Sequence, residues 1–427
     1  MSAPSATPPL LNRNRVLGFG GFLVMIAVAP LPFPRGFALS LFCQVGIMTI
    51  FALSYNMLLG QTGLLSFGHA VYYGLGAVAT MHALNAVSRG TLPIPVTLLP
   101  LVGGVTGLAV GVVLGSVTVR RAGTTFSMIS LGIGELVAAS ALMFPAFFGG
   151  EGGISGNRVT GKGLFGVTYG PQLEIYYLIA GWAFVCTAAM YALTQTPLGR
   201  IANAVRDNPE RVQFLGYDPQ RVRFLMVSLG GFFAGVAGGL AALNSEIVTA
   251  EATSAQTSGS VLLMTVVGGA RAFYGPIIGA ALVTVLQILV ASVTQAWPFY
   301  FGLLFLVIVL RAPEGVAGIL VLHRRAVQAR LVGTLVPAYV LAAVPALMLS
   351  AGVVALVELA YALANGVETG SATLRLPGVV LDARTAVPWI GSGLLAGAGL
   401  VLLSLAWREV ARRWQAIHAA LAAGGRT

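Results

Sequence analysis

Long apolar runs are the feature that most constrains how this chain of 427 residues can fold. Many of them are long enough to cross a bilayer core of roughly 30 Å, which takes about 20 helical residues. They show no alternation of polar and apolar residues, the pattern typical of membrane barrel strands. Only 9% of the residues are charged, against about a quarter in soluble domains. We therefore predict an all-α integral membrane protein, a polytopic transmembrane helix bundle.

Charges, Pro and Gly divide the apolar sequence into twelve predicted spans, about ten in a core and two near the C-terminus. The eighth span is short, and the region Gly268–Pro276 is expected to bend. Glycine accounts for 55 residues, which favours close approach of helices in lipid. The predicted spans are 16–30, 38–59, 64–86, 94–118, 124–144, 173–193, 223–243, 259–270, 275–294, 298–310, 332–356 and 387–406.

The basic residues predict the orientation of these spans. With the N-terminus in the cytoplasm, 18 of the 24 Lys and Arg residues fall in cytoplasmic segments, the asymmetry expected of such loops. Twelve spans then place both termini in the cytoplasm. We interpret the net charge of +11 as a topology signal and expect no nucleic-acid partner.

Three segments make up the predicted domain organisation. Residues 1–12 form a tail expected to be disordered, 13–322 a transmembrane domain, and 323–427 a C-terminal extension with two spans. The run after the tail resembles a signal peptide, but Pro30 fits poorly after the candidate cleavage site. We therefore interpret this run as a retained first span.

The end of the extension carries an amphipathic pattern. Val410, Trp414, Ile417 and Leu421 fall on one helical face, with Arg408 and Arg412 near it. This pattern predicts a short basic helix that lies on the inner membrane surface.

The sequence contains no motif for chemistry of its own. It has no GxxxxGK[ST] loop for phosphate, no HExxH and no Cys/His cluster for a metal. Cys43 and Cys186 lie in apolar runs and are interpreted as small buried side chains. We expect a protein that is not an enzyme and holds no cofactor or metal, so that any ATPase must be another polypeptide.

One polar segment, Thr196–Asp218, interrupts the apolar sequence on the predicted cytoplasmic side. It holds charged residues that include Arg206, Asp207 and Glu210. Asn208 and Pro209 supply a cap and a first-turn proline for a short helix. Its apolar members could press into a groove on a partner, and a solvated loop is the alternative. These apolar residues are Val212, Phe214 and Leu215, and Gly216 follows them.

A few polar residues inside the predicted spans are candidates for a translocation path. Glu135 is the only charge in the fifth span and would line the path or bond between helices. His69 follows a glycine-rich bend and would line the path or pack as a hydrogen-bonded residue. The same stretch of sequence adds Asn56, Gln61 and Ser66 as candidates.

Two glycine-interrupted segments, Gly60–Gly76 and Gly268–Gly279, lie in opposite halves of the core sequence. Broken helices often bind substrate because their backbone groups are free, although glycine also serves close packing. On the other predicted side, the loop Pro145–Gln172 is either a flexible connector or a docking or gating loop.

Three parts of the sequence together resemble a known family. They are Asn56–Ala77, Pro197–Gly216, and Val267–Ala281 followed by Arg311–Gly315. The chain resembles the membrane subunits of binding-protein-dependent ABC importers, specifically the LivM-type branched-chain amino acid permeases. The resemblance spans about residues 15–320, and residues 326–427 have no counterpart in it.

The resemblance implies a role for the polar segment. Glu210 and Gly216 match the family's Glu-Ala-Ala-x-x-x-Gly coupling motif, in which Arg211 and Val212 here replace the alanines. The segment would transmit closure of the ATPases to the spans. The implied partners are two ATPase subunits, a second related permease and a periplasmic binding protein, in a bacterial inner membrane.

The first hypothesis for function is therefore a permease subunit for branched-chain or similar small amino acids. Relatives in the family carry urea, short amides or aromatic acids. An ion-driven transporter acting alone is the second hypothesis, and the scarcity of paired carboxylates in the spans counts against it. A membrane scaffold is the third. For the C-terminal extension, membrane lipid, the partner permease or nothing specific are the alternatives.

Overall fold

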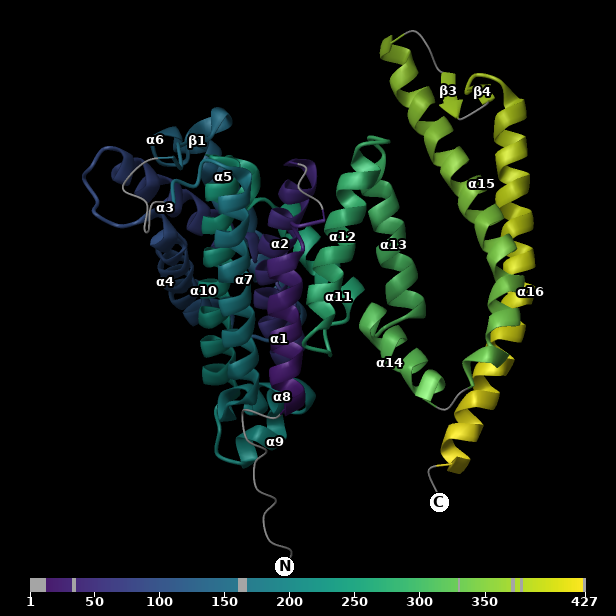
Figure 1. The fold of residues 1–427 in the computed structure, drawn as a ribbon, viewed down its shortest axis with the longest axis horizontal. Coiled ribbons are helices and arrows are strands. Elements are labelled where there is room, and N and C mark those ends of the chain that lie inside the picture. Colours follow the sequence, from purple (N-terminus) through teal and green to yellow (C-terminus); the bar gives the residue numbers. More distant parts are fainter. Residues whose placement is uncertain are drawn as a thin grey trace, which may run out of the picture. The chain divides into compact units, whose positions relative to one another are not determined.

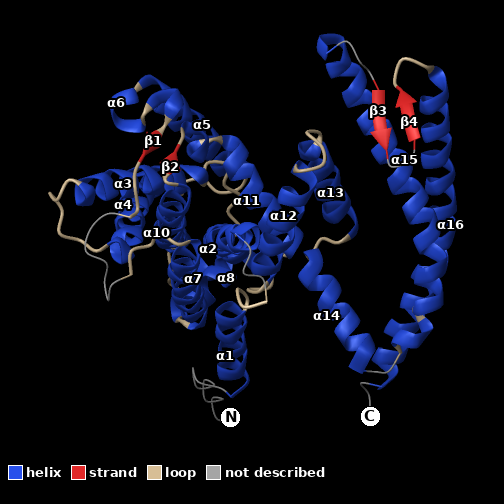
Figure 2. Cartoon of the chain, turned by 45° about the horizontal axis from the view of Figure 1, so that its top comes forward, coloured by secondary structure: helices blue, strands red, loops and turns tan. Residues whose placement is uncertain are grey.

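The computed structural model describes residues 13–32, 36–159, 167–328, 331–369, 373–376 and 379–424, and the predicted N-terminal tail lies outside these ranges. The described chain is built almost entirely of helices (Figure 1, Figure 2). Its contacts divide it into two units. The first unit is Met1–Leu289 with Phe305–Gly318, and the second is Val290–Leu304 with Ile319–Thr427.

The first unit contains the helices α1 to α11, and α12, α13 and α14 contribute to both units. Their bounds are α1 Arg13–Val28, α2 Gly36–Thr62, α3 Ala70–Ser88, α4 Leu99–Thr118, α5 Thr124–Met143, α6 Pro145–Phe148, α7 Gln172–Gln195, α8 Pro197–Asp207, α9 Pro209–Phe214, α10 Pro219–Ser245, α11 Ala255–Gly268, α12 Gly275–Ala291, α13 Trp297–Arg311 and α14 Gly315–Gln328.

Shorter elements and the C-terminal helices complete the chain. They are the 3₁₀ turns η1 Val96–Leu98, η2 Gly150–Gly152, η4 Ala250–Thr253 and η5 Val332–Thr334, the strands β1 Ile154–Ser155, β2 Ile247–Val248, β3 Thr373–Leu376 and β4 Val379–Asp382, and the helices α15 Val336–Thr369 and α16 Ala386–Gly424. Both strand pairs are antiparallel, β1 with β2 and β3 with β4.

The predicted polytopic helix bundle is confirmed, although fewer helices than expected span a membrane by themselves. Within the described residues, seven helices are long and apolar enough to cross, or eight if the bent pair α13–α14 counts as one span. Each of the twelve predicted spans falls on a helix. The count is lower because several of these helices are short, and because α3, although 19 residues long, is not apolar enough to count as a span by itself.

The core of the first unit is built around α10, which glycine brings close to its neighbours. Gly235 faces Gly103 of α4 so closely that an added Cβ would overlap the Gly103 carbonyl oxygen. Gly238 meets the carbonyl oxygen of Tyr73 in α3 in the same way. In lipid, where no hydrophobic effect drives helices together, such contacts between small residues favour tight packing.

The second unit contains the pair α15–α16, joined by the β3–β4 hairpin. The two helices meet at Gly352 and Gly399, where an added Cβ would touch the backbone of the facing helix. α16 is one continuous helix from Ala386 to Gly424. The segment predicted as a short surface helix is the last part of α16, where Val410 and Ile417 pack inside this unit against Leu335 and residues of α14 and α15. That this segment lies on the membrane surface stays a prediction.

Candidate coupling and translocation site

The predicted cytoplasmic segment folds into two capped helices between α7 and α10. The Thr196 hydroxyl accepts a hydrogen bond from the amide of Gly199 and begins α8. The Asn208 side chain accepts from the amide of Arg211, at 3.0 Å, and begins α9. Each helix has proline in its first turn, the position where a missing N–H costs nothing. The short helix predicted after Asn208 is confirmed.

The apolar residues of this segment point two ways. Val212 is buried within the chain, so it anchors α9 and is not free to reach a partner, contrary to expectation. Phe214 is 91% exposed, and Leu215 and Tyr217 are exposed beside it. Three exposed apolar or aromatic side chains within four residues of a helix end are typical of a docking surface.

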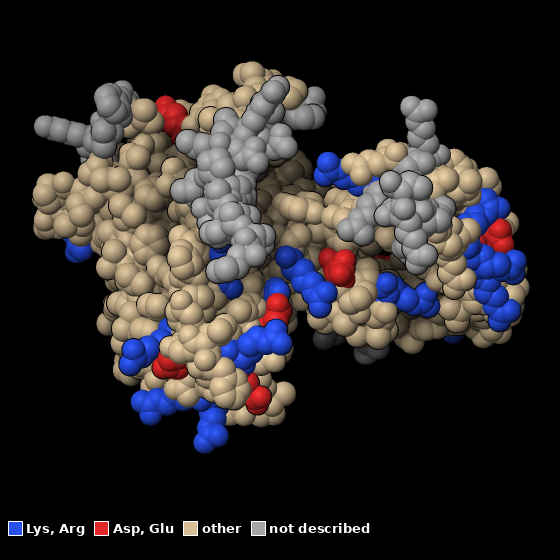
Figure 3. Space-filling model, turned by 90° about the horizontal axis from the view of Figure 1, so that it is seen from below, with Lys and Arg blue, Asp and Glu red and all other residues tan. Residues whose placement is uncertain are grey.

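The same segment also carries charged residues at its surface. Asp207 forms an ion pair with Arg206, with 3.0 Å between Oδ1 and Nε. Glu210 and Arg211 are both exposed on α9. Seen from this end of the first unit, basic and acidic side chains gather over the segment (Figure 3). The segment therefore exposes charged side chains close in sequence to Phe214 and Leu215.

Arg206 connects the segment to the end of α2. Its guanidinium donates a hydrogen bond from Nη1 to the carbonyl oxygen of Gly60. Its aliphatic part lies against Gly63, where an added Cβ would stand 3.2 Å from the Arg206 Cγ. Gly63 has a φ of 71°, a conformation that glycine adopts without strain. Arg206 thus contacts the point where α2 ends.

The two glycine-interrupted segments meet at the same point. Gly60 lies so close to the second segment that an added Cβ would overlap the carbonyl oxygen of Ala270 and the side chain of Asn56. In the second segment, Gly269 has a φ of 108°. The structure therefore brings together two breaks that lie about 200 residues apart in sequence, and Arg206 reaches both through Gly60.

Hydroxyl groups hold the non-helical residues 63–69 between α2 and α3. Tyr55 donates to the carbonyl oxygen of Ser66 at 2.9 Å, and Ser127 donates to that of Leu65 at 2.7 Å. Ser130 accepts from the amide of Phe67 at 3.1 Å. Because Ser127 and Ser130 belong to α5, these bonds tie the break to α5.

His69 ends this break and is fully buried. Its Nε2 lies 2.9 Å from the Ser54 hydroxyl, and its ring stacks on Phe51 with Tyr55 and Tyr72 edge-on. These contacts are those of a hydrogen-bonded packing residue. In this arrangement His69 does not line an open passage within the chain.

The other path candidates also separate into two groups. Asn56, Gln61 and Ser66 are buried beside the break, and the side-chain oxygens of Asn56 and Gln61 have no hydrogen-bond partner in the described protein. Glu135 instead lies on the exposed face of α5. The structure thus brings four of the five candidates together and places Glu135 on the outside of this chain.

Arg158 is an important residue that sequence reasoning missed. It is buried, and its guanidinium donates to the carbonyl oxygens of Tyr169 at 2.8 Å and Asn244 at 3.0 Å. Its amide donates to the carboxylate of Glu246. The described part of the loop Pro145–Gln172 is thereby fastened to the end of α10, also through the β1–β2 pair. A lone arginine in a glycine-rich loop was the available signal.

Metal ligands are not clustered in the part of the chain that the structure describes. No group of three or more His, Cys, Asp or Glu side chains there is arranged to hold an ion. Cys43 and Cys186 are both buried and are not joined to each other.

Comparison with known proteins decides the family. The family described as "Branched-chain amino acid transport system / permease component" matches residues 37–312, more than half of the chain. The chain belongs to this family. The match contains α2 to α13, and so includes the α8–α9 segment and both glycine-rich breaks.

Named relatives support the membership of this permease. The "High-affinity branched-chain amino acid transport system permease protein LivM" of Salmonella typhimurium is 28% identical over 315 residues, which are 69% of this chain and 73% of the relative. Its Escherichia coli namesake is 26% identical over 339 residues, 74% and 78% of the two chains. A "Probable branched-chain amino acid transport permease protein LivM" of Methanocaldococcus jannaschii is 23% identical over 325 residues, 63% and 90%. No solved structure matches.

The family resemblance predicted from the sequence is therefore confirmed. The permease is a multi-pass membrane protein and a transport subunit of the branched-chain amino acid type.

Proposed function

We propose that this permease is the translocation subunit of a binding-protein-dependent ABC importer for branched-chain or similar small amino acids. Two ATPase subunits, a second related permease and a periplasmic binding protein complete the importer. It works in a bacterial inner membrane, with both termini of this chain in the cytoplasm. The family membership and the names of the relatives support the cargo class.

The observation that carries this proposal is the contact between Arg206 and Gly60. An ATPase that docks on Phe214 and Leu215 and then moves displaces α8 and α9, with Asp207, Glu210 and Gly216 shaping that contact. Arg206 passes the displacement to the end of α2 and to the facing Ala270. A docking partner shifts the conformation of the bundle only if it binds the two conformations of the bundle with different free energies. The break at Gly60–Gly63 is the element that can differ between them.

The second part of the proposal concerns Glu135. A charged side chain on the outer face of a membrane helix is costly in lipid and usually faces protein or water. Glu135 lies on α5, which holds the break through Ser127 and Ser130. We assign Glu135 to a water-filled path between this chain and the second permease, with Asn56, Gln61, Ser66 and His69 supporting the break behind it.

The docking part is tested by polar substitution in the reconstituted importer. Phe214→Ser with Leu215→Ser is expected to lower copurification of the ATPases and to reduce amino-acid uptake at least ~10-fold, because the apolar anchors of an interface carry much of its binding energy. Val293→Ser is the control, because Val293 is also a highly exposed apolar residue but lies outside the segment. Unchanged copurification and uptake in the double variant would show that the ATPases do not dock on Phe214 and Leu215.

A second test uses the conformation of Gly216. Its φ of 85° is costly for any residue with a Cβ, and no atom lies within 4 Å of where that Cβ would stand. Gly216→Val is expected to uncouple ATP hydrolysis from uptake. Gly181→Val has the same free space but no such φ, and should leave coupling intact. Transport by the purified chain alone, without ATPases, would contradict the proposed function as a whole.

A further inference from the structure

One face of α16 carries an apolar stripe that ends in two arginines. Leu394, Val401, Leu405, Arg408 and Arg412 follow at intervals of seven, four, three and four residues, which place them on one side of a helix. The three apolar side chains are 69%, 60% and 52% exposed. Both arginines are exposed as well.

The opposite face of α16 is occupied by the second unit itself. Ala406 and Val410 are buried against Ala338 and Ala342 of α15. Farther along, the Trp414 indole donates to the Tyr339 hydroxyl at 3.0 Å. That hydroxyl also lies 2.8 Å from His323 Nε2 of α14. This packing sets the rotation of α16 and therefore holds the arginine face away from α15.

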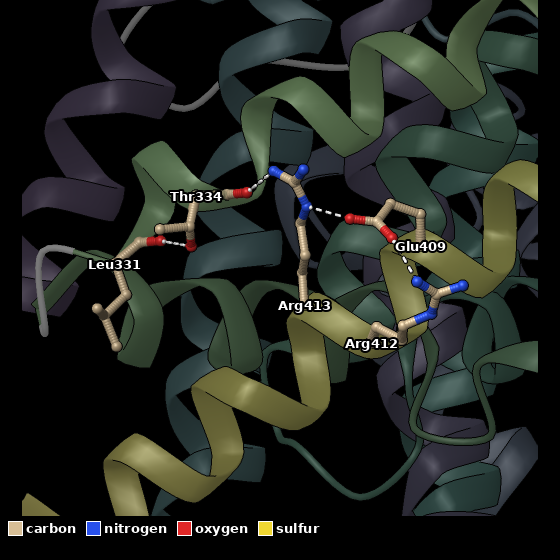
Figure 4. Close-up of polar contacts among 5 residues, drawn as sticks. All are labelled: Leu331, Thr334, Glu409, Arg412 and Arg413. Atoms are coloured by element: carbon tan, nitrogen blue, oxygen red, sulfur yellow. Dashed lines mark hydrogen bonds and ion pairs between the residues drawn. The ribbon is translucent and has the colours of Figure 1, made fainter.

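The neighbouring charged residues are engaged differently (Figure 4). Arg413 donates to the Glu409 carboxylate at 2.9 Å and to the carbonyl oxygen of Thr334, so it ties α16 to η5. Arg412 shares Glu409 at 3.3 Å and remains largely exposed. Among the described side chains, no carboxylate forms an ion pair with Arg408. Glu409 is therefore the one described acid that offsets three arginines here.

The length of α16 places these arginines at a membrane surface. Arg408 lies 22 residues after Ala386, which is about 33 Å of helix at 1.5 Å per residue. That is close to the ~30 Å thickness of a bilayer core. Trp407, half exposed, comes directly before Arg408, in the position where tryptophan marks the interface. The stripe from Leu394 to Leu405, about 17 Å of helix, then lies within the hydrocarbon next to that surface, and the arginines lie at the depth of lipid headgroups.

We propose that this face of α16 binds an anionic phospholipid. Its phosphate is held between Arg408 and Arg412, and one acyl chain runs along Leu405, Val401 and Leu394. Guanidinium groups suit phosphate because they form paired, charge-assisted hydrogen bonds. A zwitterionic choline headgroup would add a positive charge beside two arginines and is disfavoured. This proposal needs only the membrane location of the chain and does not depend on the proposed function.

The test is lipid retention by the purified full-length permease. The protein is delipidated in mild detergent, incubated with equal amounts of phosphatidylglycerol and phosphatidylcholine, and analysed by native mass spectrometry. Arg408→Gln with Arg412→Gln is expected to reduce bound phosphatidylglycerol at least ~5-fold and to leave phosphatidylcholine unchanged. Arg408→Lys with Arg412→Lys should retain at least half of the binding, because the charge remains. Arg221→Gln, at an exposed arginine of α10, is the matched control.

Two outcomes overturn the proposal. Equal phosphatidylglycerol retention by the glutamine variant and the unaltered protein would show that these arginines do not hold the lipid. Efficient disulfide formation between two copies carrying Leu405→Cys, in phosphatidylglycerol bilayers, would show that a second copy covers this face. Trp414 fluorescence and the melting temperature, unchanged in the glutamine variant, would show that its α16 still packs on α15.

Discussion

The helices α10 and α16 are equally apolar and α15 is more apolar, yet α10 is packed very differently within the chain from the pair α15–α16. Of the most apolar stretch of α10, 72% is buried, against 17% for α15 and for α16. α10 places glycines such as Gly235 and Gly238 against two neighbouring helices. In the C-terminal pair, the glycine contacts at Gly352 and Gly399 lie along a single seam.

The difference shows that apolar character predicts a span but not what covers it. In lipid, the gain from helix contact comes from close packing and hydrogen bonds, because lipid tails are as apolar as leucine. A helix with small residues on several faces becomes a core helix, as α10 does. A helix with small residues on one face forms a pair and leaves its other faces to lipid or to another protein.

The largest effect is expected in α10, the most deeply buried of these helices. Gly238→Leu places side-chain atoms on the carbonyl oxygen of Tyr73, a backbone group that cannot rotate away. We expect a loss of about 3 kcal/mol of unfolding free energy or more, the upper range for overpacking. The measurement is the fraction of monodisperse protein after heating. Gly181→Leu on α7, which meets no atom within 4 Å, should unfold like the unaltered protein.

The next largest effect is expected at the contact between Arg206 and Gly60 in the first unit, and it concerns amino-acid uptake. Arg206→Met removes the hydrogen bond to Gly60 but keeps most of the side-chain volume against Gly63. Uptake by the reconstituted importer should fall about 10-fold, equivalent to about 1.4 kcal/mol of coupling free energy, while the ATPases stay bound. Arg221→Met, at an exposed residue, is the control. Normal uptake with Arg206→Met would show that the segment Thr196–Asp218 does not act on α2 through Arg206.

A smaller effect is expected in the C-terminal pair. Gly399→Leu meets the backbone of Leu349, whereas Gly397, two residues away on α16, faces open space. We expect Gly399→Leu to cost about 1–2 kcal/mol, in the lower range for overpacking, because α15 and α16 can move apart on their open sides. Gly397→Leu should cost nothing measurable. Disulfide trapping of cysteines placed across the α15–α16 seam reports the change, and equal trapping in both variants would refute it.

The smallest effect concerns a single polar contact of the second unit. The Tyr300 hydroxyl donates to the Glu358 carboxylate at 2.8 Å. Hydrogen bonds between membrane helices average about 0.6 kcal/mol in double-mutant cycles. A cycle with Tyr300→Phe and Glu358→Gln, followed by thermal unfolding, should give an interaction of that size. A value near 2 kcal/mol would mean that α15 is held more firmly to Tyr300 of α13 than its burial indicates.

Much of this architecture was predictable because it depends on local patterns. Apolar runs place most helices of the first unit to within a few residues, as for 124–144 against Thr124–Met143, whereas α15 and α16 extend well beyond the predicted 332–356 and 387–406. Asn208 and Pro209 predict the start of α9 because capping is a contact between close neighbours in sequence. Family membership was also predictable, since its motifs lie in continuous segments.

The parts that could not be predicted depend on contacts between distant residues. Val212 and Phe214 are both apolar and two positions apart, and only the packing of α9 decides that one is buried and the other exposed. The hydrogen bond of His69 with Ser54 needs the turn between α2 and α3. The many carbonyl partners of Arg158 come from residues up to 86 positions away.

By itself, the sequence determined that this protein is a bundle of membrane helices with a capped polar segment. Hydropathy and capping act within one helix or its ends, so they can be recognised without a partner. Only the tertiary structure decided that Gly60 meets both Arg206 and Ala270, that Glu135 faces outward, and that α16 turns Arg408 and Arg412 away from α15. These features depend on how helices rotate against one another, and that rotation is set by small residues and backbone contacts distributed over the whole chain.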